Sequence, residues 1–186
     1  MRSDYKIRPP QICILGSAEP GSRAYELAGA AGEAIASFGY TVVSGCGSPA
    51  TRVAAERAML AGGRVVSIIP SDDITTENWP CNVLIPCGMG DARNLLMALS
   101  GDACLVICGR AGTISEVCLA WLHSRPLLPL VGCGGWSDTL ETSPPDEREN
   151  SKILPWGSVE VLKKHFMALG FPIISEEGEQ VVAPNP

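Results

Sequence analysis

Short apolar runs alternate along the chain with longer segments whose apolar residues recur at helical spacing. Because these runs are continuous rather than alternating, they are typical of strands buried on both faces of a parallel sheet. The intervening segments predict crossover helices, so the pattern indicates one α/β domain with a parallel sheet sandwiched by helices. The predicted strands are 11–15, 41–44, 64–69, 82–85, 103–107 and 127–131, and the predicted helices are 22–37, 49–62, 91–99, 113–122 and 158–169.

Helix boundaries are marked by capping residues and by glycine. Ser22, Ser48 and Ser158 precede helical segments, and Pro49 follows Ser48 at the first helical position. Gly39 marks the end of the first helix. We expect an N-terminal arm at 1–10, a domain at 11–172 and a C-terminal tail at 173–186, with charged loops at 71–80 and 141–150.

Three glycine loops follow predicted strands, at 16–21, 45–47 and 109–112. In parallel α/β sheets, ligands bind at the carboxyl ends of the strands, where these loops must lie. The loop at 109–112 opens directly into a helix, whose free N–H groups and dipole favour an anion. We therefore expect a phosphate there, beside the Thr113 hydroxyl and the Arg110 guanidinium. Neither GxGxxG nor GxxxxGK[ST] occurs, which argues against ordinary NAD binding and a P-loop NTPase.

Composition and charge limit the classes of partner and cofactor that we expect. The 186 residues carry a net charge of −6, which argues against a protein that coats nucleic acid. No signal peptide or apolar run of membrane-spanning length is present, so we expect a cytoplasmic protein that does not contact a membrane. The eight cysteines include no CxxC pair and the two histidines have no ligand spacing, so we expect reduced thiols and no metal site.

One stretch resembles a known superfamily. Arg93, Met97 and Asp102, followed by the segment from Gly109 to Glu116, are similar to the LOG-like (lysine-decarboxylase-like) Rossmann proteins, whose pattern is an Arg-bearing helix, a strand and PGGxGTxxE. Residues 12–17, 45–47 and 61–70 extend the resemblance over most of 11–140. It implies a Rossmann-like fold and a homodimer or homotetramer.

Two branches of that superfamily imply different functions. In the LONELY GUY branch, nucleoside 5′-monophosphates such as AMP or cytokinin riboside monophosphate are hydrolysed to base and ribose 5-phosphate, and the catalytic Arg and Glu match Arg93 and Glu116. The molybdenum cofactor carrier branch has Arg-Asn and GGW, which match Arg93-Asn94 and residues 134–136. It also has the GMGDARN of 88–94, so the chain looks closer to the carriers. Residues 44–63 faintly resemble DNA processing protein A, which binds single-stranded DNA.

The chain also departs from these patterns. Cys108 stands where the motif has Pro, and Arg110 where it has a second Gly. The GLMG of the hydrolases is replaced by the sequence of 48–51. A side chain at 110 can either obstruct the backbone's approach to a phosphate or clamp the anion itself.

Several residues have a structural as well as a functional interpretation. Glu116 fits a capping box with Thr113, or it contacts ribose and stabilises an oxocarbenium-like charge. Arg93, unfavourable near a helix start, binds ligand or forms a surface ion pair. Cys108, between a strand and a helix N-terminus, is a packed thiol, or a reactive or metal-contacting one. Trp121 and His123 suit the core or a subunit interface, and Trp136 a pocket roof or an edge.

Together these features predict a carrier-type protein that binds a phosphorylated small ligand, either molybdenum cofactor or a nucleotide. The rival is a phosphoribohydrolase using Arg93 and Glu116, and a third alternative is binding of single-stranded DNA. The predicted ligand-binding residues are Gly16, Ser17, Gly45, Gly47, Arg93, Asn94, Gly109, Arg110, Ala111, Gly112, Thr113 and Glu116.

Overall fold

A six-stranded parallel sheet forms the centre of the protein in a computed structural model, which describes residues 8–73, 78–149, 151–174 and 180–181. The strand order is β4-β3-β2-β1-β5-β6. The Rossmann-like α/β fold expected from the sequence is therefore confirmed. The strands are β1 (Gln11–Ser17), β2 (Thr41–Ser44), β3 (Arg64–Ile69), β4 (Val83–Pro86), β5 (Ala103–Cys108) and β6 (Leu127–Pro129).

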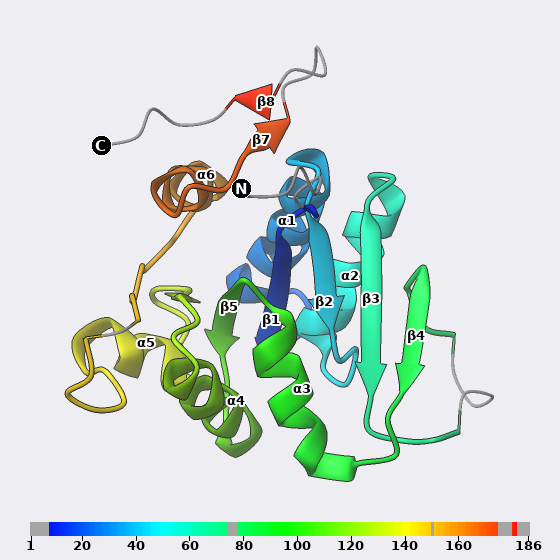
Figure 1. The fold of residues 1–186 in the computed structure, drawn as a ribbon, viewed down its shortest axis with the longest axis horizontal. Coiled ribbons are helices and arrows are strands. Elements are labelled where there is room, and N and C mark those ends of the chain that lie inside the picture. Colours follow the sequence, from blue (N-terminus) through cyan, green and yellow to red (C-terminus); the bar gives the residue numbers. More distant parts are fainter. Residues whose placement is uncertain (1–7, 74–77, 150, 175–179, 182–186) are drawn as a thin grey trace, which may run out of the picture.

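Helices cover both faces of the sheet (Figure 1). One face packs against α1 and α2, and the other against α3 and α4, so the core is divided into two apolar clusters. The helices are α1 (Arg23–Ser37), α2 (Pro49–Leu60), α3 (Arg93–Ser100), α4 (Ala111–Leu122), α5 (Gly135–Thr142) and α6 (Val159–Ala168), and the 3-10 turn η1 (Gly90–Ala92) precedes α3.

Strand β5, which lies inside the sheet between β1 and β6, shows why the apolar runs are continuous. Leu105 and Ile107 belong to the cluster under α1 and α2, whereas Cys104 and Val106 belong to the cluster under α3 and α4. Successive side chains of a strand point to opposite faces, so a strand covered on both faces needs an apolar residue at every position.

Three predicted helix starts, those marked by serine, are confirmed. The Oγ atoms of Ser22, Ser48 and Ser158 each accept a hydrogen bond from a backbone N–H in the first turn of α1, α2 and α6. At α2 the cap is reciprocal, because the Thr51 side chain accepts from the Ser48 N–H. These contacts satisfy N–H groups that a helix start leaves without partners.

Two segments differ from the prediction. Helix α5 begins at Gly135, within a predicted loop, because its glycine pair and its serine and threonines give little helical signal. In the tail, β7 (Ile173–Ile174) pairs antiparallel with β8 (Gln180–Val181). The predicted arm and the loop at 71–80 lie partly outside the described residues, and no described helix is long and apolar enough to cross a membrane.

The strand order fixes where a ligand can bind. The chain proceeds outward from β1 through β2, β3 and β4, and then returns to the other side of β1 with β5. This reversal separates the loops after β1 and β5 and leaves a crevice at the carboxyl ends of these strands. In Figure 1 these ends lie at the lower edge of the sheet, where α3 and α4 also begin or end.

Close contact between α1 and α2 yields a test of the fold. A Cβ on Gly32 would collide with the backbone oxygen of Ala54, which cannot move aside as a flexible side chain can. Gly32→Ala is expected to lower the free energy of unfolding in urea by about 1–3 kcal/mol, the usual cost of overpacking. Gly112→Ala, which meets nothing within 4 Å, is the matched control. Equal stability of the two variants would contradict this packing.

Candidate functional site

A cavity of about 210 Å³ opens at the carboxyl ends of β1 and β2. It lies at the crevice that the strand order predicts, and most of its wall comes from loops and helix starts. Eight of the predicted ligand-binding residues share it. Its lining residues are Ile14, Gly16, Gly45, Gly47, Ser48, Thr51, Asp91, Arg93, Asn94, Gly112, Thr113 and Glu116.

Two glycines allow the wall of the cavity to form. Gly16 has φ +106°, and a Cβ there would collide with the backbone oxygen of Ile107 on β5. Gly45 lies directly against the guanidinium of Arg93, whose Nη1 occupies the space that a side chain at 45 would need. Any larger residue at either position would therefore alter the backbone or displace the arginine.

Arg93 enters the cavity as the first residue of α3. Its Nε is buried and has no hydrogen-bond partner, and no ion pair to Arg93 is found among the described residues. The predicted alternative, a surface ion pair, is therefore wrong for this part of the chain. Native proteins rarely leave a buried donor unpaired, so this Nε–H retains an unused hydrogen-bonding capacity.

Glu116 faces the same cavity from α4 and is only 8% exposed. Burial raises the pKa of its carboxyl to about 7, although the positive charge of Arg93 acts in the opposite direction. The capping-box interpretation is wrong, because α4 begins at Ala111, its N-cap is Arg110, and no side chain caps it. Thr113 is therefore inside the helix, and Glu116 lies too far along it to reach back to the N-cap.

Some residues that line the cavity were not predicted from the sequence. Ser48 and Thr51 line the wall while capping α2, and the Ser48 hydroxyl donates to the Gly16 oxygen at 2.7 Å. Asp91 lines it from η1, just before Arg93. The sequence does indicate Ser48 and Thr51 as cavity residues, because both follow the second glycine loop at a helix start. Of the predicted residues, Asn94 donates to Ser115 Oγ at 2.6 Å.

A second cavity of about 490 Å³ lies next to the first. Ser17, Gly109 and Arg110 line it, whereas Ala111 lines neither. Thr113 and Arg110 thus face different cavities and do not form the joint phosphate site that the sequence suggested. The full lining is Ser17, Ala18, Glu19, Ser22, Arg23, Ala24, Cys108, Gly109, Arg110, Gly132, Cys133 and Gly135.

Cys108 ends β5 in a left-handed conformation, with φ +48°. Proline cannot adopt this angle, since its ring fixes φ near −65°, so replacement of the motif Pro accompanies a different loop path. Burial and contact with Cys133 raise the pKa of Cys108 to about 12. A thiol activated by a lowered pKa is therefore not what this loop produces.

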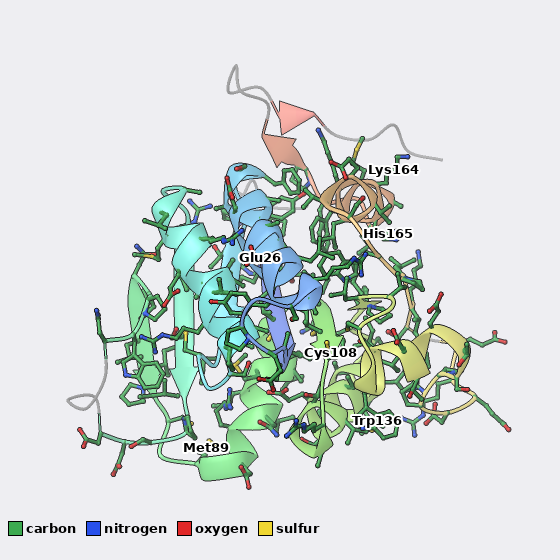
Figure 2. All side chains as sticks on the ribbon, turned by 180° about the vertical axis from the view of Figure 1, so that it is seen from behind. Glu26, Met89, Cys108, Trp136, Lys164 and His165 are labelled. Atoms are coloured by element: carbon green, nitrogen blue, oxygen red, sulfur yellow. The ribbon has the colours of Figure 1, made fainter. Side chains whose placement is uncertain are left out.

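The two aromatic side chains near the motif have different surroundings. Trp121, near the end of α4, is buried in the apolar cluster under α3 and α4, as expected. Its Nε1–H donates to Asp146 Oδ1 at 2.7 Å. Trp136 is 37% exposed on α5, and its backbone N–H donates to Gly109. Figure 2 shows Trp136 below Cys108, and Trp136 is not among the residues that line either cavity.

This arrangement defines a Rossmann-like α/β protein with a small polar cavity at the switch point of its sheet. The chain belongs to the SLOG cluster4 family, whose model matches residues 9–159. An uncharacterized protein of Archaeoglobus fulgidus is 33% identical over 120 residues, which is 64% of this chain and 79% of that protein.

Solved structures share the fold. TM1055, a structural genomics target, has a TM-score of 0.77 at 23% identity and covers 84% of this chain and 98% of its own. The molybdenum cofactor binding protein of Rippkaea orientalis has a TM-score of 0.73 at 23% identity, covering 88% and 99%. DNA processing protein A of Helicobacter pylori has a TM-score of 0.64 at 17% identity, covering 86% and 81%. The resemblance to LOG-like proteins and cofactor carriers is thereby confirmed at the level of the fold.

The raised pKa of Glu116 predicts a pH dependence of stability. An unfolded glutamate ionises near pH 4.5, but the folded one does so near 7, so the folded protein holds a proton that the unfolded chain has lost. Stability is full below pH 4.5 and falls as pH rises to 7, by about 3 kcal/mol in all. Urea unfolding at pH 5 and pH 8 checks this. Glu116→Gln should be less sensitive to that change, and an unchanged difference would contradict the assignment.

Proposed function

We propose that this protein binds a phosphorylated small molecule in the first cavity and acts as a carrier-type binding protein. The observation that carries the proposal is the buried Nε of Arg93, which has no partner beside three glycine-bearing loops. A phosphate oxygen supplies the acceptor that this guanidinium lacks, in a bond strengthened by charge.

The start of α4 supports the same ligand chemistry. Gly112 and Thr113 line the cavity within the first turn of this 12-residue helix, where backbone N–H groups are free and the dipole is positive. The Thr113 hydroxyl adds a donor. A phosphate therefore meets helix N–H groups on one side and Arg93 on the other.

Molybdenum cofactor is our first candidate for that ligand. The support comes from the shared fold with the molybdenum cofactor binding protein of Rippkaea orientalis, together with the Arg93-Asn94 pair that resembles the carriers. A cavity of about 210 Å³ is below the roughly 300–1,000 Å³ usual for whole ligands, so it suits the phosphate-bearing end. The remainder would extend toward solvent. Assembly into homodimers or homotetramers and a cytoplasmic location stay predictions of the sequence.

Replacing Arg93 tests the proposal. Arg93→Gln is expected to weaken binding of molybdenum cofactor or AMP by roughly 1.5–3 kcal/mol, about 10- to 100-fold, because one charge-assisted contact is lost. Equilibrium binding measured by fluorescence or calorimetry gives the two dissociation constants. Arg148→Gln, which removes an exposed arginine paired with Asp146, is the matched control. Equal affinities of the two variants would refute the anion site.

Arg110 reports how far the ligand extends. It lines the second cavity, so it can contact a ligand only if the ligand reaches past the loop at 109–112. The same titration with Arg110→Ala decides this point. A weaker affinity places part of the ligand over the second cavity, and an unchanged affinity confines the ligand to the first and refutes the predicted clamp.

Hydrolysis of a nucleoside 5′-monophosphate is the second candidate function. It is favoured by Glu116, since a carboxyl whose pKa is about 7 is partly ionised and partly protonated at neutral pH. Its ionised form can stabilise positive charge at the anomeric carbon, and Arg93 in the same cavity can hold the substrate.

AMP distinguishes the two candidates. If the protein is a hydrolase, incubation with AMP releases adenine and ribose 5-phosphate, measured by chromatography, and Glu116→Ala abolishes the release while the protein stays folded. Turnover retained in that variant would exclude Glu116 as the catalytic group. The carrier proposal instead expects binding of AMP or cofactor without any release of base.

Binding of single-stranded DNA is the least supported alternative. The net charge of −6 opposes attraction to a phosphate backbone, and the DNA processing protein shares only the fold with this chain. A mobility shift of single-stranded DNA by the protein at low salt would support this alternative.

A further inference from the structure

Two cysteine thiols share the wall of the second cavity. Cys108 is the last residue of β5, and Cys133 follows β6 in the next loop. Because β5 and β6 are paired parallel neighbours, their carboxyl ends deliver both residues to the same place. Both side chains are partly buried, so they are reachable from the cavity without being surface thiols. Figure 2 shows Cys108 in the interior near the carboxyl ends of the strands.

The two cysteines are in direct contact. The backbone N–H of Cys108 donates to Cys133 Sγ at 3.1 Å, and both side chains line the same cavity. Cys133 Sγ is also 3.1 Å from Ser137 Oγ. The sulfurs are therefore held as a pair before any ligand arrives.

The loop that carries Cys133 is fixed by an internal carboxylate. Asp138 accepts hydrogen bonds from the backbone N–H groups of Gly132 and Gly134, both at 2.8 Å, and of Cys133 at 3.4 Å. Gly135 lies so close to the backbone of Cys108 and Gly109 that a Cβ there would collide with it. Both ends of the thiol pair thus sit on constrained backbone, which lowers the cost of ordering a metal site.

A second thiol pair provides an internal comparison. Cys13 and Cys104 are partners across β1 and β5, but both are fully buried and line none of the cavities described here. Desolvation raises the pKa of Cys13 well above its usual value. That pair has a packing role, whereas the pair in the second cavity has room beside it for a ligand.

The ligand set selects the kind of metal. No group of three or more histidine, cysteine or acidic residues that could hold a metal occurs among the described residues, so a tetrahedral zinc site is not completed. Two sulfurs suffice for a soft cation that accepts two ligands, and thiolates favour Cu(I). We propose that Cys108 and Cys133 form a two-thiolate site for Cu(I) in the second cavity.

Two cations of the lining, Arg23 and Arg110, oppose the net charge of −1 that two thiolates and one Cu(I) carry. Two carboxylates, Glu19 in the lining and Asp138 against the Cys133 loop, act in the other direction. Each thiol releases its proton to solvent when the metal binds, so affinity rises with pH.

Anaerobic titration with Cu(I) against a chromophoric Cu(I) chelator tests the site in the whole protein. The wild type is expected to hold one tightly bound equivalent that is lost in both Cys108→Ser and Cys133→Ser. Cys118→Ser is the matched control, because Cys118 is also partly buried but lies on α4, outside this cavity. X-ray absorption of the bound copper should give two sulfur ligands.

Two results would overturn the proposal. One is equal Cu(I) stoichiometry in the wild type and both cavity variants; the other is an equal loss in Cys118→Ser. Should a variant fold poorly, protection of wild-type Cys108 and Cys133 from alkylation by added Cu(I), followed by peptide mass spectrometry, gives the same decision. Arg93 and Glu116 take no part in this site, so its failure leaves the proposed phosphate ligand untouched, and the reverse is also true.

Discussion

The cavity at the end of the sheet is shaped around one partly buried guanidinium, that of Arg93. Arg93 is held against the bare backbone of Gly45, and its Nε finds no acceptor in the described protein. Glu116, in the same wall, does not come within ion-pair distance of Arg93 and has a pKa of about 7. An unsatisfied buried donor costs about 1–3 kcal/mol, and such a cost persists where function needs it. The architecture around it keeps the arginine from being neutralised internally.

The fold imposes this arrangement through close backbone approaches. The reversal of strand order at β1 brings the first glycine loop against β5, and only glycine at position 16 permits the contact. The second glycine loop leaves the space into which the guanidinium extends. Shape in this region is therefore set by absent side chains as much as by the polar groups that remain.

Patterning and capping residues were sufficient to predict most of the fold. Strands β2 and β3 and the starts of α1, α2 and α6 agree with the sequence, because burial on both faces and serine caps leave local signatures. Helix α5 left none. The residues of the site were predicted in outline, but their division between two cavities was not. That division depends on the directions in which Arg110 and Thr113 project from the start of α4. Likewise, the burial that moves the pKa of Glu116 arises from tertiary packing.

The loop around Asp138 has a consequence for recognition. Its backbone N–H groups form a concave donor set of the kind that holds anions elsewhere, but a side chain of the same protein already occupies it. A dissolved anion would have to displace a tethered carboxylate, whose effective concentration is far higher than that of a free solute. The protein thus fills one potential anion receptor beside the second cavity with its own carboxylate, a competitor that cannot diffuse away.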